Sequence, residues 1–501
     1  MSIENILSSS YLRQLHLVRF LITNGPVSQK VILNKFNYSN ATLYRDISNL
    51  NNMLDPIKIL TNDLIKISIP IHYNNRFIFS SFLKKSTEFN LIQEIYFRED
   101  HSLLSLADMF FVSESTVRRM IRKINKELLP YGIKIGSTPI KLFGNEKNIY
   151  NLMVRYFEET YPSHDYPFSS LKLNVLQKII LATTDKQNDN FNYPDVERLK
   201  LIIIVIIIRL QNGNTIDTSL ADPPTISHNI ISNPVYTKLF KAIFKFELNK
   251  KSLNQILYPF STTNFATNQK QLKQMASKNE QIRNKILLLT QLVKKISTRY
   301  SISLDNTDDL VLHLFNTSEL KQTFTSILYD KNKEFVDEAT LYNTEFIDYV
   351  KNEVQQLKND PNGEEENIFS LCYILITHWK NLAIQLKKSS FKLKVGLFFD
   401  SDLEHMYFIN DSLNEELNHI LDIVPLDFLT SKELKVTSKE FDFIITTIPD
   451  LNYSSVPVVC IPMYLRSTDF ENIIHLYNTI QRTKKSHKKL SSIPKMIKSK
   501  E

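Results

Sequence analysis

An internal repeat near the N-terminus constrains the fold of this chain more than any other feature. Residues 28–54 and 102–128 align without a gap at an offset of 74 residues. Both copies keep the pattern Ser-x-x-Thr-[Leu/Val]-x-Arg, which begins at Ser39 in the first copy and at Ser113 in the second. Two copies of one pattern predict two copies of one structural unit in tandem.

Each copy has the pattern of a helix, a tight turn and a second helix. In the first copy, Gly25 and Pro26 end an apolar-periodic helix, and Ser28 and Ser39 are suited to cap the next two helices. Apolar residues then recur at helical spacing in both copies, at Leu43, Ile47, Leu50 and Leu54 and at Val117, Ile121, Ile124 and Leu128. The short gap before this last helix is typical of a helix-turn-helix. A β-like segment follows each copy, at 57–69 and 133–143, and predicts a hairpin wing.

The face of each last helix opposite the apolar one carries the candidate DNA-contacting residues. Arginine pairs with guanine edges or phosphates, and small hydroxyls allow close approach to a groove. The candidates are Asn40, Thr42, Tyr44 and Arg45 in the first copy, and Ser115, Thr116, Arg118, Arg119, Arg122, Lys123 and the wing residue Lys134 in the second. The alternative is a helical bundle with incidental surface arginines, which two aligned copies disfavour. The second copy is richer in arginine, and we expect it to contribute more affinity.

Charge and composition agree with a nucleic-acid-binding protein inside the cell. The net charge is +8, of which residues 1–150 carry +7 and residues 482–501 another +7, so the middle is acidic. Basic segments suit phosphate backbones, although a solvated surface fits the lysine-rich tail equally well. The two cysteines are too few to form a disulfide framework, which fits a reducing compartment. The longest apolar run, 201–208, is far shorter than the roughly twenty residues of a membrane span. With no signal peptide evident, we expect a cytoplasmic protein without membrane contact.

The rest of the chain divides into a helical middle and an α/β end. Residues 150–390 are mainly amphipathic, and they contain no glycine-rich phosphate loop, metalloprotease motif or nucleophile elbow, so we expect neither an enzyme nor a cofactor. From residue 391, short apolar strands at 393–399, 441–448 and 456–461 alternate with helices, which predicts a parallel sheet. The fold class predicted is mainly α and multidomain.

This order of parts, and above all the stretch LADMFFVSESTVRRMIRKINKEL, resembles the Mga/AtxA family of virulence regulators of Gram-positive bacteria. The resemblance implies a transcriptional activator that binds double-stranded DNA and forms a homodimer, which we expect to be held mainly by residues beyond 276. The implied domains are tandem winged helix-turn-helix domains at 1–75 and 76–149, phosphotransferase-regulation (PRD-like) domains at 150–272 and 273–390, an EIIB-like α/β domain at 391–482, and a basic tail at 483–501.

The resemblance also implies regulation by a phosphotransferase-system phosphocarrier, which phosphorylates histidines of the PRD-like domains. The matching position in the first domain is Ile202, which disfavours phosphorylation there. The second domain offers His313 and His378, both in apolar stretches, and each fits either a phosphoryl acceptor or a packed core histidine.

An active EIIB domain carries a cysteine just after its first strand. Here Phe399, Asp400, Ser401 and Asp402 occupy that place, so we expect no phosphotransfer activity. Cys460 lies on a later strand and is interpreted as a core residue.

Two other classes of protein remain as alternatives. A phosphotransferase-system phospho-relay or EIIB-type protein is disfavoured by the missing cysteine. An RNA-binding antiterminator shares such regulatory domains, but the helical N-terminal repeat disfavours its small β-type RNA-binding module.

Overall fold

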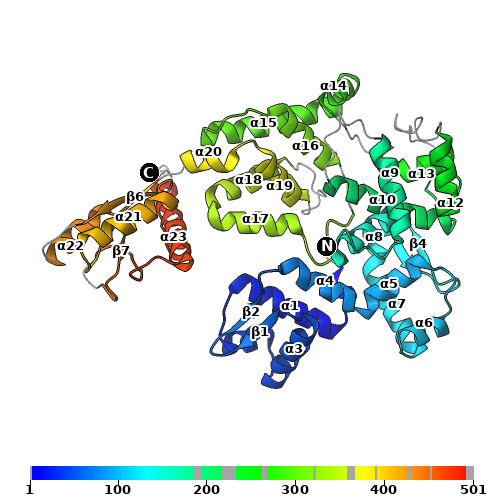
Figure 1. Cartoon of the computed structure of the whole chain (residues 1–501), viewed down its shortest axis with the longest axis horizontal. Helices are drawn as coiled ribbons and strands as arrows, with labels where there is room; N and C mark the ends of the chain where they lie inside the picture. Colours follow the sequence, from blue (N-terminus) through cyan, green and yellow to red (C-terminus); the bar gives the residue numbers. More distant parts are fainter. Residues whose placement is uncertain are drawn as a thin grey trace, which may run out of the picture. The chain divides into compact units, whose positions relative to one another are not determined.

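The computed structural model is mainly helical, as Figure 1 shows. The chain divides into two compact units. The first comprises Met1–Gln271 and Glu319–Lys331, and the second comprises Leu272–Ser318 and Asn332–Glu501. The structure describes residues 3–183, 193–216, 233–261, 266, 268–319, 323–357, 367–389, 392–426, 431–451 and 454–491.

The first copy of the repeat folds as a winged helix-turn-helix. Its elements are η1 (Glu4–Ile6), α1 (Ser9–Asn24), α2 (Gln29–Phe36), α3 (Asn40–Met53), β1 (Lys58–Thr61) and β2 (Ile65–Ser68). Gly25 ends α1 at φ +65°, a conformation that glycine adopts without strain. Ser39 caps α3, because its hydroxyl accepts a hydrogen bond from the Thr42 amide. The predicted turn chemistry of this copy is confirmed, except that Ser28 caps α2 without a side-chain hydrogen bond.

The second copy repeats this architecture. Its elements are α4 (Asn75–Lys85), α5 (Thr87–Phe97), α6 (Leu103–Met109), α7 (Glu114–Leu128), η2 (Leu129–Tyr131), β3 (Ile133–Ile135) and β4 (Leu142–Gly144). Ser102 and Ser105 form a capping box on α6, and Ser113 caps α7. Both predicted wings are two-stranded antiparallel hairpins, β1 with β2 and β3 with β4.

The turns of the two copies share one unusual backbone conformation. Asn37 and Phe111, which are 74 residues apart, both lie in the left-handed region, at φ +53° and +52°. Asparagine tolerates this conformation, whereas a bulky side chain is strained by it. The Phe111 side chain is 94% exposed and therefore gains no packing in the fold that would offset the strain.

One continuous hydrophobic core joins both winged units to the helices that follow. The predicted apolar faces lie in it: Leu43, Leu50, Val117 and Ile124 are fully buried, and Ile121 is partly buried.

The remaining helices of this unit are α8 (Glu146–Thr160), α9 (Ser170–Thr183), α10 (Tyr193–Gln211), α12 (Pro234–Phe244) and α13 (Lys250–Ser261), with α14 (Gln269–Lys278) at its boundary. The apolar run at 201–208 lies within α10 and packs in this core. Among the described residues, no helix is long and apolar enough to cross a membrane.

A short segment from the second helical region returns to the first unit. Residues 323–331 contribute Phe324, Ile327 and Leu328 to the first unit's core. The Glu159 carboxylate on α8 accepts hydrogen bonds from the backbone amides of residues 327–329. The sequence did not predict this contact, whose partners are about 170 residues apart in the chain.

The second unit combines helices with a parallel sheet. Its helices before the sheet are α15 (Glu280–Tyr300), α16 (Thr307–Glu319), α17 (Lys331–Tyr342), α18 (Thr344–Gln356), α19 (Asn367–His378) and α20 (Leu382–Ser389). The α/β part contains β5 (Leu393–Phe398), α21 (Leu403–Leu417), β6 (Leu421–Pro425), α22 (Ser431–Thr437), η3 (Ser438–Glu440), β7 (Phe443–Thr446), β8 (Val458–Cys460) and α23 (Ser467–Ser491). Helix α23 extends into the predicted basic tail, whose residues 492–501 lie outside the described part of the chain.

The sheet has the strand order β6-β5-β7-β8 with every pair parallel, so the predicted α/β architecture is confirmed. Strand β6 was not among the predicted strands. The interpretation of Cys460 as a core residue is wrong, because this side chain is exposed. It lies at the end of β8, an edge strand, and apolar periodicity alone does not distinguish an edge strand from a central one.

Candidate nucleic-acid interface

The predicted DNA-contacting side chains gather on the outer faces of α3 and α7 and on the second wing. Eight of them are exposed, namely Asn40, Tyr44, Arg45, Ser115, Arg118, Arg119, Arg122 and Lys134, and three are half-buried, namely Thr42, Thr116 and Lys123. The apolar faces of the same helices are committed to the core, so the orientation of both helices is fixed by packing.

The half-buried threonines belong to the helix caps. The Ser39 and Thr42 hydroxyls lie 2.9 Å apart, and the Ser113 and Thr116 hydroxyls lie 3.0 Å apart. In both copies the cap serine also accepts a hydrogen bond of 3.2 Å from the backbone amide of its threonine. Thr42 and Thr116 therefore serve mainly to cap their helices. The neighbouring exposed side chains are the ones fully accessible to a ligand.

The charges of the two recognition helices differ strongly. Helix α7 holds five Lys/Arg and two Asp/Glu, whereas α3 holds Arg45 and Asp46 only. Asp46 is buried and is neutralised by Arg13 from α1 through two hydrogen bonds of 2.6 and 2.8 Å. The predicted greater positive charge of the second helix is thus present in the folded chain.

The basic residues of α7 differ in whether their side chains already contact other residues of the chain. Arg118 lies 3.8 Å from Glu114 one turn earlier, and this surface pair is weak enough to open for a phosphate. Arg119 and Arg122 form no ion pair among the described residues. The Lys123 ammonium donates to the Leu7 carbonyl and ties α7 to the N-terminal segment, so it serves the fold.

An asparagine on each recognition helix holds the wing that follows. The Asn51 amide donates to the Ile59 carbonyl (3.1 Å) and accepts from the Ile59 amide (2.6 Å). Asn125 makes the same pair with Ile135, at 2.9 and 2.6 Å. Sequence reasoning missed these residues, although an identical amide at the 74-residue offset was a visible signal. The clamp fixes each wing relative to its recognition helix.

A second missed feature lies at the start of the first helix-turn-helix. Gln29, the first residue of α2, donates to the Asn40 side-chain carbonyl (2.8 Å) and accepts from the Tyr44 hydroxyl (3.0 Å). No residue pattern pointed to Gln29, because the contact depends on the angle between α2 and α3.

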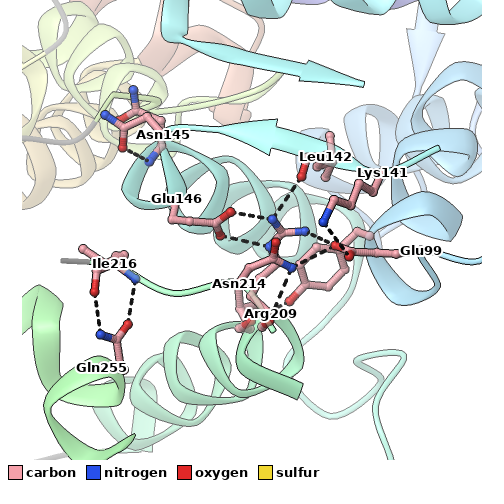
Figure 2. Close-up of polar contacts among 12 residues, drawn as sticks. Glu99, Lys141, Leu142, Asn145, Glu146, Arg209, Asn214, Ile216 and Gln255 are labelled. Atoms are coloured by element: carbon pink, nitrogen blue, oxygen red, sulfur yellow. Dashed lines mark hydrogen bonds and ion pairs between the residues drawn. The ribbon is translucent and has the colours of Figure 1, made fainter. Parts of the chain in front are cut away.

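A buried arginine connects α10 to the second winged unit, as Figure 2 shows. Arg209 is fully buried and donates to Glu146 (2.5 and 3.0 Å), to Glu99 (2.5 Å) and to the Leu142 carbonyl (3.1 Å). Burial alone lowers the pKa of Arg209, but hydrogen bonds and charge attraction from Glu146 and Glu99 outweigh it and raise this pKa. Glu146 begins α8 and Leu142 belongs to β4, so the cluster fixes three elements together.

The two candidate phosphorylation sites in the second unit lie side by side. The imidazole rings of His313 on α16 and His378 on α19 have centroids 4.6 Å apart. His313 is exposed and His378 is half-buried, so the packed-core alternative does not hold for His313. Burial, and repulsion from His313, lower the pKa of His378 below 6.5, which favours a neutral ring at physiological pH.

The loop after β5 carries carboxylates that serve the local fold, and it contains no cysteine. The Asp402 carboxylate caps α21 by accepting from the His405 amide at 2.8 Å. Asp400 accepts a hydrogen bond of 2.7 Å from the Thr447 hydroxyl. An acidic loop of this kind repels a phosphoryl group.

Comparison with known proteins gives two domain matches and three relatives. The Mga helix-turn-helix domain matches residues 72–157, and the PRD domain of the M protein trans-acting positive regulator matches residues 183–382. A putative trans-acting regulator of Streptococcus pneumoniae is 23% identical over 439 residues, covering 85% of this chain and 86% of that protein. Two Bacillus anthracis proteins named capsule synthesis positive regulators are also similar. AcpA is 25% identical over 44% of this chain and 45% of its own length, and AcpB is 21% identical over 87% and 91%.

Proposed function

Because this chain belongs to the Mga family of DNA-binding transcriptional regulators, we propose that it binds promoter DNA through both helix-turn-helix units and activates transcription there. The observation that carries the proposal is the pair of capped recognition helices, α3 and α7, whose outer faces are exposed and whose wings are clamped in the same way. The direction of regulation follows the two relatives that are named positive regulators. A phosphotransferase component, the alternative, is not favoured.

The proposal keeps the predicted division into domains at 1–75, 76–149, 150–272, 273–390 and 391–482, followed by the basic tail. In this scheme the first two domains grip DNA, and Arg118, Arg119, Arg122 and Lys134 contact phosphates. The middle domains and the EIIB-like domain regulate rather than catalyse. The Arg209 cluster supports such coupling, because it joins a helix of the PRD region to the second wing.

Filter binding of the full chain to one duplex DNA and to an RNA duplex of the same sequence tests the proposal. We expect DNA to be preferred, and we expect the preference to shrink in the Arg118/Arg119/Arg122 triple alanine variant. Transcript levels from promoters that the chain occupies should fall when its gene is deleted. Equal affinity for DNA and RNA, or transcripts that rise on deletion, would contradict DNA recognition or activation respectively.

We further propose a homodimer whose interface includes an apolar patch on the α/β part. The patch consists of Leu403, Tyr407 and Phe408 on α21 with Met463 and Tyr464, each about half or more exposed. The Phe408 and Tyr464 rings lie 6.3 Å apart, so the patch is continuous across the two segments. Two linked copies bind two half-sites more tightly than one copy.

Sedimentation of the full chain at micromolar concentration tests the dimer. Tyr407→Ser with Tyr464→Ser should shift the wild-type dimer toward monomer, and Val436→Ser, which changes a 72% exposed apolar residue on α22, should not. A monomeric wild type, or a double variant that stays dimeric, would refute this interface.

We propose that the His313–His378 pair receives a phosphoryl group from a phosphocarrier of the sugar phosphotransferase system. A phosphocarrier would transfer its phosphoryl group so that a new N–P bond forms on an imidazole and the carrier's own phosphoryl bond breaks. The transfer adds roughly −1.5 to −2 charges at the surface of the second helical region. Phosphohistidine detected by mass spectrometry in wild type, but absent from a His313→Ala/His378→Ala variant, would support this. Its absence after incubation with an active phosphocarrier would overturn it.

A further inference from the structure

The first helix-turn-helix contains a neutral hydrogen-bond network at the surface where a recognition helix begins. Tyr44 on α3 donates to the Gln29 carbonyl oxygen at 3.0 Å, and the Gln29 amide donates to the Asn40 carbonyl oxygen at 2.8 Å. Asn40 and Tyr44 are exposed, and Gln29 is half-buried. The network lies beside the cap at Ser39 and carries no charge.

The direction of each hydrogen bond sets the orientation of the next amide. Because the Tyr44 hydroxyl donates to Gln29, the carbonyl oxygen of Gln29 faces the ring and its amino group faces Asn40. The Asn40 oxygen therefore points toward Gln29. An amide oxygen has two lone pairs, so Asn40 keeps one acceptor position and its amino group available to a ligand.

The remaining groups of Asn40 match the major-groove edge of one base. Adenine presents an amino donor at N6 beside an acceptor at N7, and an asparagine amide pairs with both. Side chains that are already ordered lose less conformational entropy on binding than free ones. The network thus has the chemistry of a preorganised base reader.

Residues 102–128, all of which the structure describes, form no equivalent network in the second helix-turn-helix. At the 74-residue offset, Gln29, Asn40 and Tyr44 correspond to Leu103, Glu114 and Arg118. Glu114 is a carboxylate, which cannot donate to the N7 acceptor, and it lies 3.8 Å from Arg118. The two units are therefore built for different contacts, one neutral and directional and the other cationic.

We infer that the Gln29–Asn40–Tyr44 network reads an adenine, and that sequence discrimination at this base resides in the first unit while the second unit supplies most of the salt-dependent affinity. The inference rests on the proposed function, since it requires that α3 enters a major groove. Asn40 is the contacting residue, and Gln29 and Tyr44 are positioning residues.

The test uses the full chain and a pool of duplex DNA with a randomised central segment. Sequences enriched by wild type are compared with those enriched by Asn40→Ala, by Gln29→Leu and by Tyr44→Phe. Gln29→Leu introduces the residue type that the second unit carries at this place. Asn49→Ala is the matched control, because it removes another exposed amide nine residues further along α3.

We expect Asn40→Ala to lose discrimination at one A·T pair by roughly 5- to 150-fold, the range for a bidentate base contact. Gln29→Leu and Tyr44→Phe should weaken discrimination at that same pair, to a smaller extent, and Asn49→Ala should not. The slope of log affinity against log salt should stay at its wild-type value in all four variants, because a neutral network releases no counterions.

Two results overturn this inference without touching the proposed function. One is an unchanged preference for the A·T pair in Asn40→Ala. The other is a lost preference together with a log–log salt slope lower by about one, which marks a phosphate contact. If wild type itself enriches no sequence, both this inference and the proposed function fail. Wild-type enrichment that survives in Asn40→Ala leaves the proposed function intact.

Discussion

The Arg209 cluster offers a quantitative test of how the helical region is joined to the second winged unit. Arg209→Met keeps most of the side-chain volume but removes four hydrogen bonds, three of them to the carboxylates of Glu99 and Glu146. Those carboxylates are only 13% and 11% exposed, so they stay buried without their main partner. Leaving a buried charge uncompensated costs about 3–5 kcal/mol.

The cost should fall mainly on Glu146. Glu99 keeps Lys141 at 3.8 Å and Asn214 at 3.0 Å. Among the described residues, Glu146 keeps only the weaker field of the α8 N-terminus. Adding Glu146→Gln to Arg209→Met should therefore restore roughly half of the lost stability, about 2 kcal/mol, since replacing both partners of a buried pair is far less harmful than removing one.

Native-state hydrogen exchange measures this locally. The amides of β4 and α10 should exchange roughly 140- to 4,000-fold faster in Arg209→Met, which corresponds to the predicted loss at about 1.4 kcal/mol per tenfold. Arg98→Met is the control, because Arg98 is 60% exposed and its ion-pair partner among the described residues is the exposed Asp100, so exchange should stay close to wild type. Exchange within threefold of wild type in Arg209→Met would refute the account of this cluster.

Three further predictions concern single sites. Phe111→Asn should raise the free energy of unfolding by about 0.5–1 kcal/mol, because it removes the backbone strain of a phenylalanine in the left-handed region, and Asn37→Phe should lower it. Melting temperatures of the two variants that shift in the same direction, or not at all, would contradict this. Burial raises the pKa of Glu159 to about 7 despite three backbone donors, so the contribution of this carboxyl to the free energy of unfolding is complete below pH 4.5 and is lost as pH rises through 7. In Glu159→Gln the free energy of unfolding should therefore depend less on pH in this window. A pH profile unchanged from wild type would exclude the raised pKa. His313→Ala should raise the pKa of His378 in an NMR titration, since it removes a repelling charge. An unaltered or lower pKa would contradict the repulsion between the two rings.

Features set by neighbouring residues were predictable from the sequence. The caps at Ser39 and Ser113, the stop at Gly25 and the buried faces of α3 and α7 all follow from local chemistry and helical periodicity. The repeat made these predictions stronger, because each copy tested the other.

Features set by distant residues were not predictable. Arg209 was visible as the end of an apolar helix, but its partners lie 63 and 110 residues away. His313 and His378 were identified one by one, whereas their ring contact depends on how α16 and α19 pack. The Gln29 network needs the angle between two helices, and the exposure of Cys460 needs the order of strands in the sheet. None of these is encoded in a local pattern.

The central claim is that the arginine face of α7 grips the phosphate backbone of DNA. Its most direct test is the salt dependence of duplex binding by the full chain and by the Arg118/Arg119/Arg122 triple alanine variant, both shown by circular dichroism to be folded. Each phosphate contact contributes about 0.9 to the log–log slope, so three contacts predict a slope lower by about 2.7 and a roughly 40-fold smaller change in affinity between 50 and 200 mM salt. A triple variant with the affinity and the slope of wild type would contradict the claim.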